Sequence, residues 1–565
     1  MSAQSMGLTP VASTPANRAE AARFLTQATF GPTDQDIDHL MSVGYRAWLD
    51  EQLHAPVNAV SHLNFWDRAS ASSVQGFLHD GGWPTESFWR EALTSPDQLR
   101  QRVAFALSEI FVISTLDACG DNTNGRGAAG YMDMLGKKAF GDFRSLLEAV
   151  ALHPVMGCYL SHIHNLKEDT SSGREPDQNF AREVMQLFSI GLYELNKDGT
   201  LKTDGQGAPI ETYGPLDIQG MAKVFTGWSW YCFDNSDSCF FRSFGTDSGK
   251  DLGSNDRWVN PMQSFARYHS TSEKKFLGVT VPAQSTPDPA KSVQMALDRL
   301  ATHPNVGPFI GRQLIQRLVT SNPSPAYVGR VSKAFDEAGG NLGAMVQAIL
   351  MDPEARDMQG ALASKTFGKP KEPVLKLSAL LRAYGATSTT GSFLMGYTED
   401  PSFALAQSPM RSPTVFNFFR PGYVLPSSQS SQAGLQTPEF QLLNETSVAG
   451  AANFLGTAMY WGIGSKGYDG KSPGPDIQFA YQRTPDNAVL VLADKPTDLV
   501  EDVNQHLMYG TMSAGLKAEI VNAVSQLDFR SKPTVTADDI LGTRQHRVWA
   551  ALLLTVVSPE FQIQR

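Results

Sequence analysis

The sequence has no long hydrophobic run and little charge of either sign. No stretch of about 18 or more apolar residues occurs, so we expect no membrane-spanning helix. Lys plus Arg number 47 and Asp plus Glu 57 in 565 residues, which gives a net charge of −10. Nucleic acids and anionic membranes are bound through basic patches, so this mildly acidic chain predicts neither as its main partner.

The sequence also lacks the short motifs of common cofactor sites. It contains no GxSxG, P-loop or dinucleotide-binding fingerprint, so no nucleotide cofactor is expected. No CxxC pair or Cys/His spacing typical of zinc occurs. His153, His162 and His164 lie close together, but the first precedes Pro154 as a helix cap and the other two fall at a helix end. We therefore predict no metal site from them.

Cysteine is scarce, with four residues in the chain. Cys232 and Cys239 stand in "WYCFDNSDSCFF", flanked by aromatic residues and separated by a polar turn. This pattern favours a disulfide, which would contribute about 2–3 kcal/mol, over two buried thiols. The pairing of Cys119 and Cys158 stays open.

Helical periodicity dominates the remainder, and 41% of the residues are hydrophobic, enough for a sizeable core. We predict helices at 99–114, 131–151, 154–164, 302–320, 325–338, 341–351 and 366–383, and about four more in 478–565. The fold class is therefore mainly α, a large multi-helical assembly with short-strand or irregular insertions at about 198–285.

The domain organisation follows from breaks in this pattern. Residues 1–17 are predicted to be a flexible lead-in, since they lack the charged and apolar regions of a signal peptide. The protein is then either cytoplasmic or a mature form whose leader was removed. Residues 18–385 form the main helical domain, "ATSTTGS" (386–392) resembles a linker, and 386–565 form a C-terminal helical part packed on the first.

The segment "QNFAREVMQLFSIGLYELNKDG" (178–199) combines an apolar stripe with a compact polar patch. The patch consists of Asn179, Arg182, Glu183 and Gln186. Arg182 and Glu183 are adjacent and diverge by about 100°, so each is expected to pair with the 99–114 helix, for example with Arg100, Arg102 or Glu109. The patch is either a buried ion-pair network or a site.

As a site, the patch would use Glu183 as acid or base, with Asn179, Arg182 and Gln186 binding substrate. A glycosidase needs a second carboxylate at about 5–9.5 Å, and we nominate Glu109 and Glu445.

Other candidate binding residues lie in aromatic segments. "SPMRSPTVFNFFRPGY" (408–423) carries Arg411, Asn417 and Arg420 in a rigid aromatic loop, which suits a sugar or polymer, although the aromatics could equally fill a core seam. Trp228 of "VFTGWSW" and Tyr268 and His269 of "RYHSTSEKKFLG" are further candidates, although a lone His there is more often a hydrogen-bonded turn residue.

Asp198 and Asp204 alternate with Gly and Thr in "NKDGTLKTDGQG", as ligands do in calcium loops. Calcium could bind there, but the Glu expected at the twelfth position of such a loop is absent.

Several long segments resemble the bacterial domain-of-unknown-function 1800 family. They include "LRQRVAFALSEIFVIS", "PDQNFAREVMQLFSIGLYELNKDGT", "YHSTSEKKFLG", "HPNVGPFIGRQLIQRLVTSNPSPAYV", "SPMRSPTVFNFFRPGY" and "SPEFQIQR", in family order from about residue 18 onward. The resemblance implies a large, mostly helical, usually exported protein, often encoded beside a domain-of-unknown-function 1501 partner; it implies no reaction. Some members carry a Trp-His-Asn-His-type stretch where this chain has Leu107 to Ile110, and a His in place of Phe188.

Together these features predict a periplasmic or secreted protein, with a monomer favoured. The leading hypothesis is an enzyme acting on polysaccharide or another cell-surface polymer through carboxylate acid–base chemistry. The alternatives are a non-catalytic binding or assembly protein that works with an exported partner, and a metal-dependent oxidase.

Overall fold

The computed structural model describes residues 12–57, 61–71, 83–116, 124–232, 235–242, 255–464, 474–528 and 534–565. Within these ranges the chain forms 27 α-helices and eight strands of two or three residues each. The prediction of a mainly α fold is confirmed. None of the described helices is long and apolar enough to cross a membrane.

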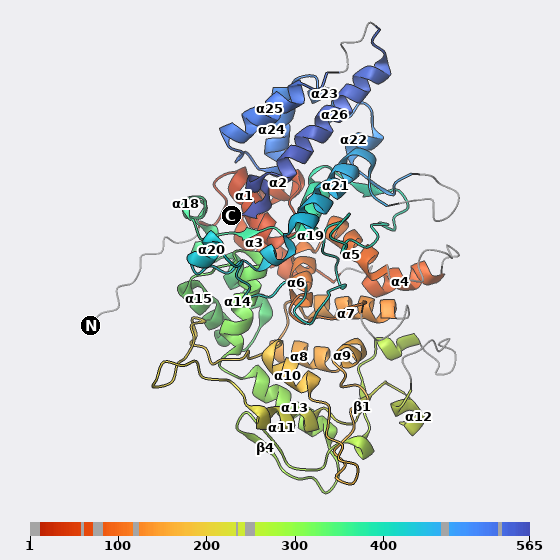
Figure 1. Ribbon diagram of the computed structural model, residues 1–565, viewed down its shortest axis with the longest axis vertical. Helices are drawn as coiled ribbons and strands as arrows, with labels where there is room; N and C mark the ends of the chain where they lie inside the picture. The colour runs from red at the N-terminus through yellow and green to blue at the C-terminus, as the bar shows by residue number, and fades with distance from the viewer. Residues whose placement is uncertain are drawn as a thin grey trace, which may run out of the picture.

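The helices form three tiers along the longest axis of the molecule (Figure 1). The central tier contains α1 (Arg18–Ala28), α2 (Asp34–Val43), α3 (Tyr45–His54), α4 (His62–Ala71), α5 (Trp83–Thr94), α6 (Gln98–Ser108), α7 (Asn124–Lys138), α14 (Val306–Leu318), α15 (Pro325–Glu337), α16 (Leu342–Leu350), α17 (Pro353–Arg356), α18 (Met358–Ala363), α19 (Pro373–Ala383), α20 (Gln429–Gln432), η3 (Pro438–Leu442) and α21 (Glu445–Trp461).

The lower tier contains α8 (Phe143–Ala151), α9 (Pro154–Tyr159), α10 (Asn179–Gln186), α11 (Pro215–Val224), α12 (Asp237–Phe240), η1 (Asn255–Trp258), η2 (Ala266–Tyr268) and α13 (Pro289–Ala301). The upper tier contains α22 (Ala480–Arg483), α23 (Ala488–Leu492), α24 (Pro496–Leu507), α25 (Ala514–Ser525) and α26 (Ala537–Val556). After α26 the chain forms a short last helix, α27 (Pro559–Gln562).

The strands join in antiparallel pairs. β1 (Trp228–Ser229) pairs with β2 (Gln263–Ser264), and β3 (Lys274–Phe276) with β4 (Val279–Val281), within the insertion predicted at 198–285. Two pairs lie outside it: β5 (Lys369–Pro370) with β8 (Ile563–Gln564), and β6 (Thr387–Ser388) with β7 (Ile477–Gln478). The predicted linker at 386–392 is therefore partly a strand.

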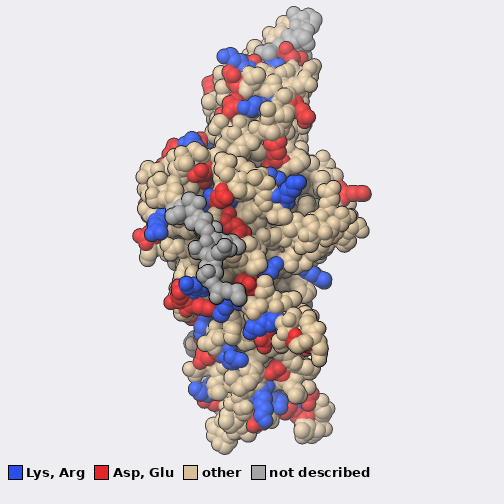
Figure 2. Space-filling model, turned by 90° about the vertical axis from the view of Figure 1, so that its left-hand side faces the viewer, with Lys and Arg blue, Asp and Glu red and all other residues tan. Residues whose placement is uncertain are grey.

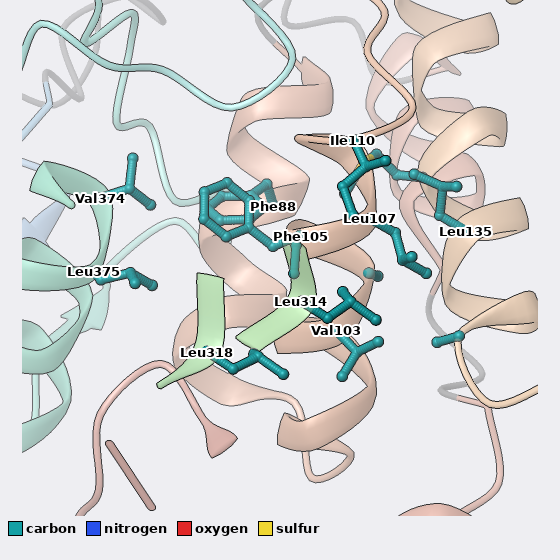
Figure 3. Packing of buried hydrophobic residues seen from close by; sticks show 14 of the residues in the cluster. Phe88, Val103, Phe105, Leu107, Ile110, Leu135, Leu314, Leu318, Val374 and Leu375 are labelled. Carbon is teal, nitrogen blue, oxygen red and sulfur yellow. The ribbon is translucent and has the colours of Figure 1, made fainter. Parts of the chain in front are cut away.

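Helix α6 lies at the centre of the core, between α5, α7 and α14 (Figure 3). Leu99, Val103 and Leu107 are fully buried on it, at helical spacing. The ring of Phe105 lies 5.3 Å from that of Phe88 on α5. Burial of each such side chain contributes about 1.5–3 kcal/mol, so the position of α6 is strongly fixed.

Several predicted helices differ from the observed ones. The helix expected at 154–164 ends at Tyr159, just before Ser161 adopts a left-handed conformation, and the helix expected at 366–383 begins only at Pro373. The helix expected at 99–114 ends at Ser108, because the following backbone pairs with a distant segment: the Thr115 N–H donates to the Met410 carbonyl at 2.9 Å. The helix expected at 131–151 is two helices, α7 and α8, separated where the Asp142 carboxylate caps α8 by accepting from the Ser145 N–H at 2.8 Å.

The lead-in prediction concerns mostly residues 1–11, which lie outside the described residues. Nearer α1, the Ser13 carbonyl accepts from the Tyr45 N–H at 3.0 Å, and Asn17 caps α1 by accepting from the Glu20 N–H. The segment from residue 13 is therefore held against the helices. The Gly-rich segment "GIGSKGYDGKSPGPD" (462–476), which the sequence predicts to be a long surface loop, also falls largely outside the described ranges.

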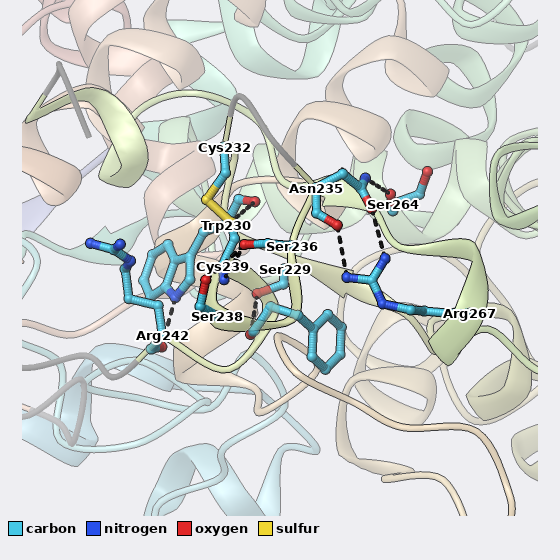
Figure 4. The surroundings of a disulfide bond; sticks show 11 residues. Ser229, Trp230, Cys232, Asn235, Ser236, Ser238, Cys239, Arg242, Ser264 and Arg267 are labelled. Carbon is cyan, nitrogen blue, oxygen red and sulfur yellow. Dashed lines mark hydrogen bonds between the residues drawn. A yellow bond between two sulfur atoms is a disulfide. The ribbon is translucent and has the colours of Figure 1, made fainter. Parts of the chain in front are cut away.

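The predicted disulfide is confirmed: Cys232 is bonded to Cys239, with their Cα atoms 6.3 Å apart (Figure 4). The guanidinium of Arg267 braces the turn from outside, donating to the Asn235 carbonyl at 2.7 Å. Cys158 is disulfide-bonded as well, whereas Cys119 lies outside the described residues. Disulfides persist in oxidising compartments, which fits an extracellular location.

Charged side chains are mixed on the surface. In the view of Figure 2, Lys and Arg are interspersed with Asp and Glu, without a large field of one sign. That face offers no extended basic surface of the kind nucleic acids bind.

Candidate functional site

Glu109 follows directly on the last residue of α6 and is 5% exposed. Its Oε1 accepts from Asn417 Nδ2 at 3.0 Å, a contact that joins the end of α6 to the loop at 408–423. Its main-chain carbonyl accepts from the Arg317 guanidinium on α14 at 2.9 Å. Two residues nominated separately from the sequence, Glu109 and Asn417, thus meet in the structure.

Behind Glu109 lies a fully buried ion cluster around Lys369. Its ammonium lies 3.2 Å from Glu372 Oε1 and 3.1 Å from Glu439 Oε1, and it donates to the Arg317 carbonyl at 2.9 Å. The other oxygen of Glu372 accepts from Gln407 Nε2 at 2.9 Å. Every hydrogen-bonding position of the ammonium is thus occupied.

Glu109 and Glu372 lie in the same buried cluster, where the Glu372 charge disfavours ionisation of Glu109. Burial and the neighbouring Glu372 raise the pKa of Glu109 well above its usual range. Burial acts to raise the pKa of Glu372, but the Lys369 charge and the other groups around its carboxylate lower it. Of the two carboxyls, Glu109 is therefore the one that holds a proton more strongly.

The net charge of this cluster depends on that proton. Three buried cations, Arg102, Arg317 and Lys369, face three carboxyl groups, those of Glu109, Glu372 and Glu439. With Glu109 protonated the cations exceed the carboxylates by one, and loss of the proton balances the charges. Burial favours the protonated form of Glu109, whereas the three neighbouring cations would balance the negative charge left after the proton departs.

Glu109 also faces a small recess. Its lining includes Phe105, Ser108, Ser408, Asn417 and Phe418, and its volume is about 10 Å³. That is about the room of one water molecule. The Ser408 hydroxyl is fully buried and has no hydrogen-bond partner among the described residues, so a water here would have a polar group besides Glu109 to bind.

The backbone around the recess is strained. Ala406, Met410 and Asn417 adopt left-handed conformations, with φ of 59°, 58° and 63°. Such values are uncommon for residues other than glycine, and each costs about 1–3 kcal/mol unless the surroundings impose it. Three of them within one segment show that the recess wall is held in a fixed, unfavourable shape, which is frequent at functional sites.

The chain matches the family model described as "Protein of unknown function (DUF1800)" over residues 23–563. It belongs to the DUF1800 family. The match runs from α1 to β8, so Glu109, its buried partners and the recess all lie inside the family region. Comparison with curated proteins and with solved structures finds no significant match.

In this DUF1800 chain the polar patch on α10 does not form the ion-pair network with the 99–114 helix that the sequence led us to expect. Glu183 is 9% exposed and Arg182 is exposed, and burial raises the pKa of Glu183, with Arg182 as the opposing charge. The expected pairing with the 99–114 helix is wrong, because Arg100 pairs with Asp97 and Arg102 donates to the Arg317 carbonyl at 2.6 Å.

The neighbours of the α10 patch come instead from the lower tier. The Tyr213 hydroxyl donates to Gln186 Oε1 at 3.2 Å, and Asn179 is exposed beside Ser161. Among the described residues Glu183 and Glu109 share no hydrogen-bond partner, and Glu183 is not among the residues that line the Glu109 recess. The structure thus places the two candidate carboxylates in separate surroundings.

The loop at 408–423 is irregular, as predicted, and its arginines face different environments. Arg411 is buried, pairs with Glu399 at 2.7 Å and lies over the Tyr397 ring. Arg420 is exposed, with its guanidinium 4.9 Å from the centre of the Phe416 ring. Of the two, only Arg420 is available to a ligand.

The candidates of the lower tier are mostly engaged in packing. His269 is fully buried between the Thr226 carbonyl at 2.9 Å and the Ser292 hydroxyl at 3.0 Å, and burial lowers its pKa to about 4. Trp228 is 6% exposed within β1. Tyr268 packs against the Phe240 ring at 4.1 Å, close to the disulfide.

The remaining nominated carboxylates lie at the surface. Glu445 is exposed in the first turn of α21. Asp198 and Asp204 each accept hydrogen bonds within their own turns, from Thr200 and from Ala208 respectively. Among the described residues no three His, Cys, Asp or Glu side chains gather as metal ligands would. Calcium at these aspartates stays a prediction.

The sequence reasoning missed Lys369, Glu372 and Gln407. In "KPKEPV" (369–374) the Pro after Glu372 indicates the start of a helix, and Glu372 does precede α19. Nothing local shows that the charges around it are buried. One signal was available in the sequence. Lys369 and Glu372 stand directly before a strongly apolar helix, which is unusual for an exposed helix cap.

Proposed function

We propose that the protein is an exported enzyme that cleaves polysaccharide or another cell-surface polymer, with Glu109 as its general acid. The observation that supports this most is the buried Glu109 carboxyl, whose pKa burial raises, facing a strained, water-sized recess. A carboxylic acid that keeps its proton near neutral pH is suited to protonating the leaving oxygen of a scissile bond.

The buried cluster would then act after proton transfer. The Glu109 carboxylate left behind would be stabilised by the Arg317 and Lys369 charges and by the Asn417 amide, which already donates to it. Such fixed charges in a water-excluded site lower the barrier where charge develops. Glu372 positions the proton and does not reach the recess lining, so it is a positioning residue.

The geometry favours one arrangement of the reactants. The recess has room for a water but not for a sugar ring, so the polymer would lie across its rim beside Phe418, with the exposed Arg420 nearby. Glu372 is fully buried and does not line the recess, so it cannot act on a bound polymer as the second carboxylate of a standard glycosidase does. The proposal is therefore a single acid supported by a buried partner, not a pair flanking the bond.

Export is proposed on two grounds. The Cys232–Cys239 disulfide is of the kind that persists outside the reducing cytoplasm. The resemblance of the long motifs to a usually exported family gives the same expectation, with the periplasm or the medium as its location.

The test compares wild type with Glu109→Gln and, as matched control, Glu445→Gln, which removes an exposed carboxylate. Each is incubated with a panel of neutral and acidic polysaccharides, and new chain ends are measured over time. We expect wild type to cleave at least one polymer, Glu109→Gln to be slower by about 100-fold or more, and the control to be unchanged. Equal rates for wild type and Glu109→Gln would refute the assignment, and absence of cleavage throughout would favour the non-catalytic binding protein.

A further inference from the structure

A second surface feature is a groove of about 440 Å³ between α21 and α26. Its lining includes Asn453, Thr457, Tyr460, Trp461, His546 and Trp549. It shares no residue with the recess at Glu109, and none of the predicted site residues lies in it.

Two aromatic side chains of the groove, Tyr460 and Trp549, are held in place by their neighbours, and a third, Trp461, is exposed to solvent. Tyr460 stands between Trp461 and Trp549, with ring centres 4.7 and 6.3 Å away and steep interplanar angles. The Trp549 ring is fixed because its Nε1 donates to the Gly456 carbonyl at 2.9 Å. Trp461, by contrast, is 67% exposed, a large apolar surface that its own chain leaves open to solvent.

The imidazole of His546 is also oriented. Its Nδ1 is hydrogen-bonded to the Gly542 carbonyl one helical turn earlier, so this nitrogen carries the proton and Nε2 acts as an acceptor. The Tyr460 hydroxyl lies 3.3 Å from Nε2. The tyrosine and the histidine thus form a hydrogen-bonded pair beside the exposed indole.

Polar groups complete the groove in a regular pattern. Asn453, Thr457 and Trp461 follow one another at intervals of four on α21, so they share one face of the helix. The Asn453 and Thr457 side chains are exposed, and no described residue is hydrogen-bonded to either. Among the described residues the lining contains no Lys, Arg, Asp or Glu, so none of these residues would attract or balance a charged ligand.

We infer that this groove binds a neutral glycan chain. A pyranose ring presents an apolar face of C–H groups and an edge of hydroxyls, which matches an exposed indole flanked by amide, hydroxyl and imidazole groups on one helix face. A lipid or an apolar helix would leave these polar groups unpaired, and an acidic polymer would find no cation. The inference does not depend on the acid assigned to Glu109.

The test uses isothermal titration of the full chain with cellohexaose, chitohexaose and maltohexaose as neutral probes and hexagalacturonate as an acidic one. We expect saturable binding of at least one neutral probe and weaker or no binding of the acidic probe. Trp461→Ala should weaken the neutral interaction about tenfold or more, as loss of a central aromatic contact does. Asn453→Ala should weaken it to a smaller extent.

Two controls keep the outcomes separate. Phe403→Ala removes another aromatic of similar exposure, 66%, outside the groove and should bind as wild type does. Glu109→Gln should also bind normally, so that loss of cleavage and loss of binding can be told apart. The inference is overturned if no neutral probe binds, if Trp461→Ala binds as tightly as wild type while remaining folded, or if hexagalacturonate binds more tightly.

Discussion

Replacement of Glu109 by Gln tests the protonation of the buried cluster without knowledge of the substrate. If Glu109 carries a proton, Gln keeps its shape and its neutral charge, and the Gln carbonyl can accept from Asn417 Nδ2, now at 3.0 Å from Oε1. The free energy of unfolding should then change by less than about 1 kcal/mol at neutral pH.

The opposite assignment predicts a much larger effect. If Glu109 were ionised and paired with Arg317, whose Nε lies 3.6 Å from Oε2, the substitution would leave a buried cation without its partner. Breaking such a pair costs about 3–5 kcal/mol. The two assignments therefore differ by at least about 2 kcal/mol, a difference that urea denaturation followed by tryptophan fluorescence resolves.

The pH dependence of unfolding gives a second readout. The pKa of Glu109 is raised in the folded protein by burial and by Glu372, so the proton's stabilising contribution is complete below the unfolded pKa, about 4.3, and is lost as pH rises toward the folded pKa. Over that window wild type should lose about 1.4 kcal/mol per pH unit relative to Glu109→Gln, which lacks the titrating group. A parallel pH dependence of the two proteins, or a Glu109→Gln variant several kcal/mol less stable, would refute the reasoning.

Three further predictions concern other charged groups. Lys369→Met should destabilise by about 3–5 kcal/mol in urea denaturation, because two buried carboxylates lose their shared cation; a loss below about 1 kcal/mol would contradict this. Glu183→Gln should leave stability at neutral pH unchanged or raised in the same assay, because burial raises the pKa of Glu183 and no buried Arg pairs with it in the described structure; a loss of several kcal/mol would restore the ion-pair interpretation. The pKa of His506 is raised to about 9, chiefly by Asp502, so its contact with Asp34 at 3.1 Å should stabilise fully below about pH 6.5 and be lost as pH rises through 9; a His506→Gln variant should show a flatter melting temperature across that window.

The sequence predicted the helical class well, because periodicity and capping are local properties. It placed α14, α15 and α16 within a few residues, and it paired Cys232 with Cys239 from their spacing and aromatic surroundings. It extended α6 too far because the apolar residues after Ser108 continue the helical pattern. Their strand-like pairing with residues 410–411 depends on a segment far along the chain.

The candidate site was predicted only in part for the same reason. Glu109 and Asn417 were nominated from their own segments, but the contact between them, and the partnership with Glu372, exist only in the folded core. Glu183 was nominated for a compact polar patch, a property of one helix, and its expected partners proved to belong elsewhere. Periodicity shows which side chains share a face, and it does not show which charges become buried together.

The pairing of β8 with β5 has a consequence for how the molecule is made. Gln564 donates its amide to the carbonyls of Leu318 and Val319 at the end of α14, and the Arg565 carbonyl accepts from Arg23 on α1. The central tier therefore needs residues 563–565 to satisfy groups that are synthesised hundreds of residues earlier. During synthesis these groups of α1 and α14 stay unpaired until β8 has been made. Completion of the central tier should therefore be late and slow. Until β8 pairs with β5, the incompletely folded chain should remain accessible to export machinery and to chaperones.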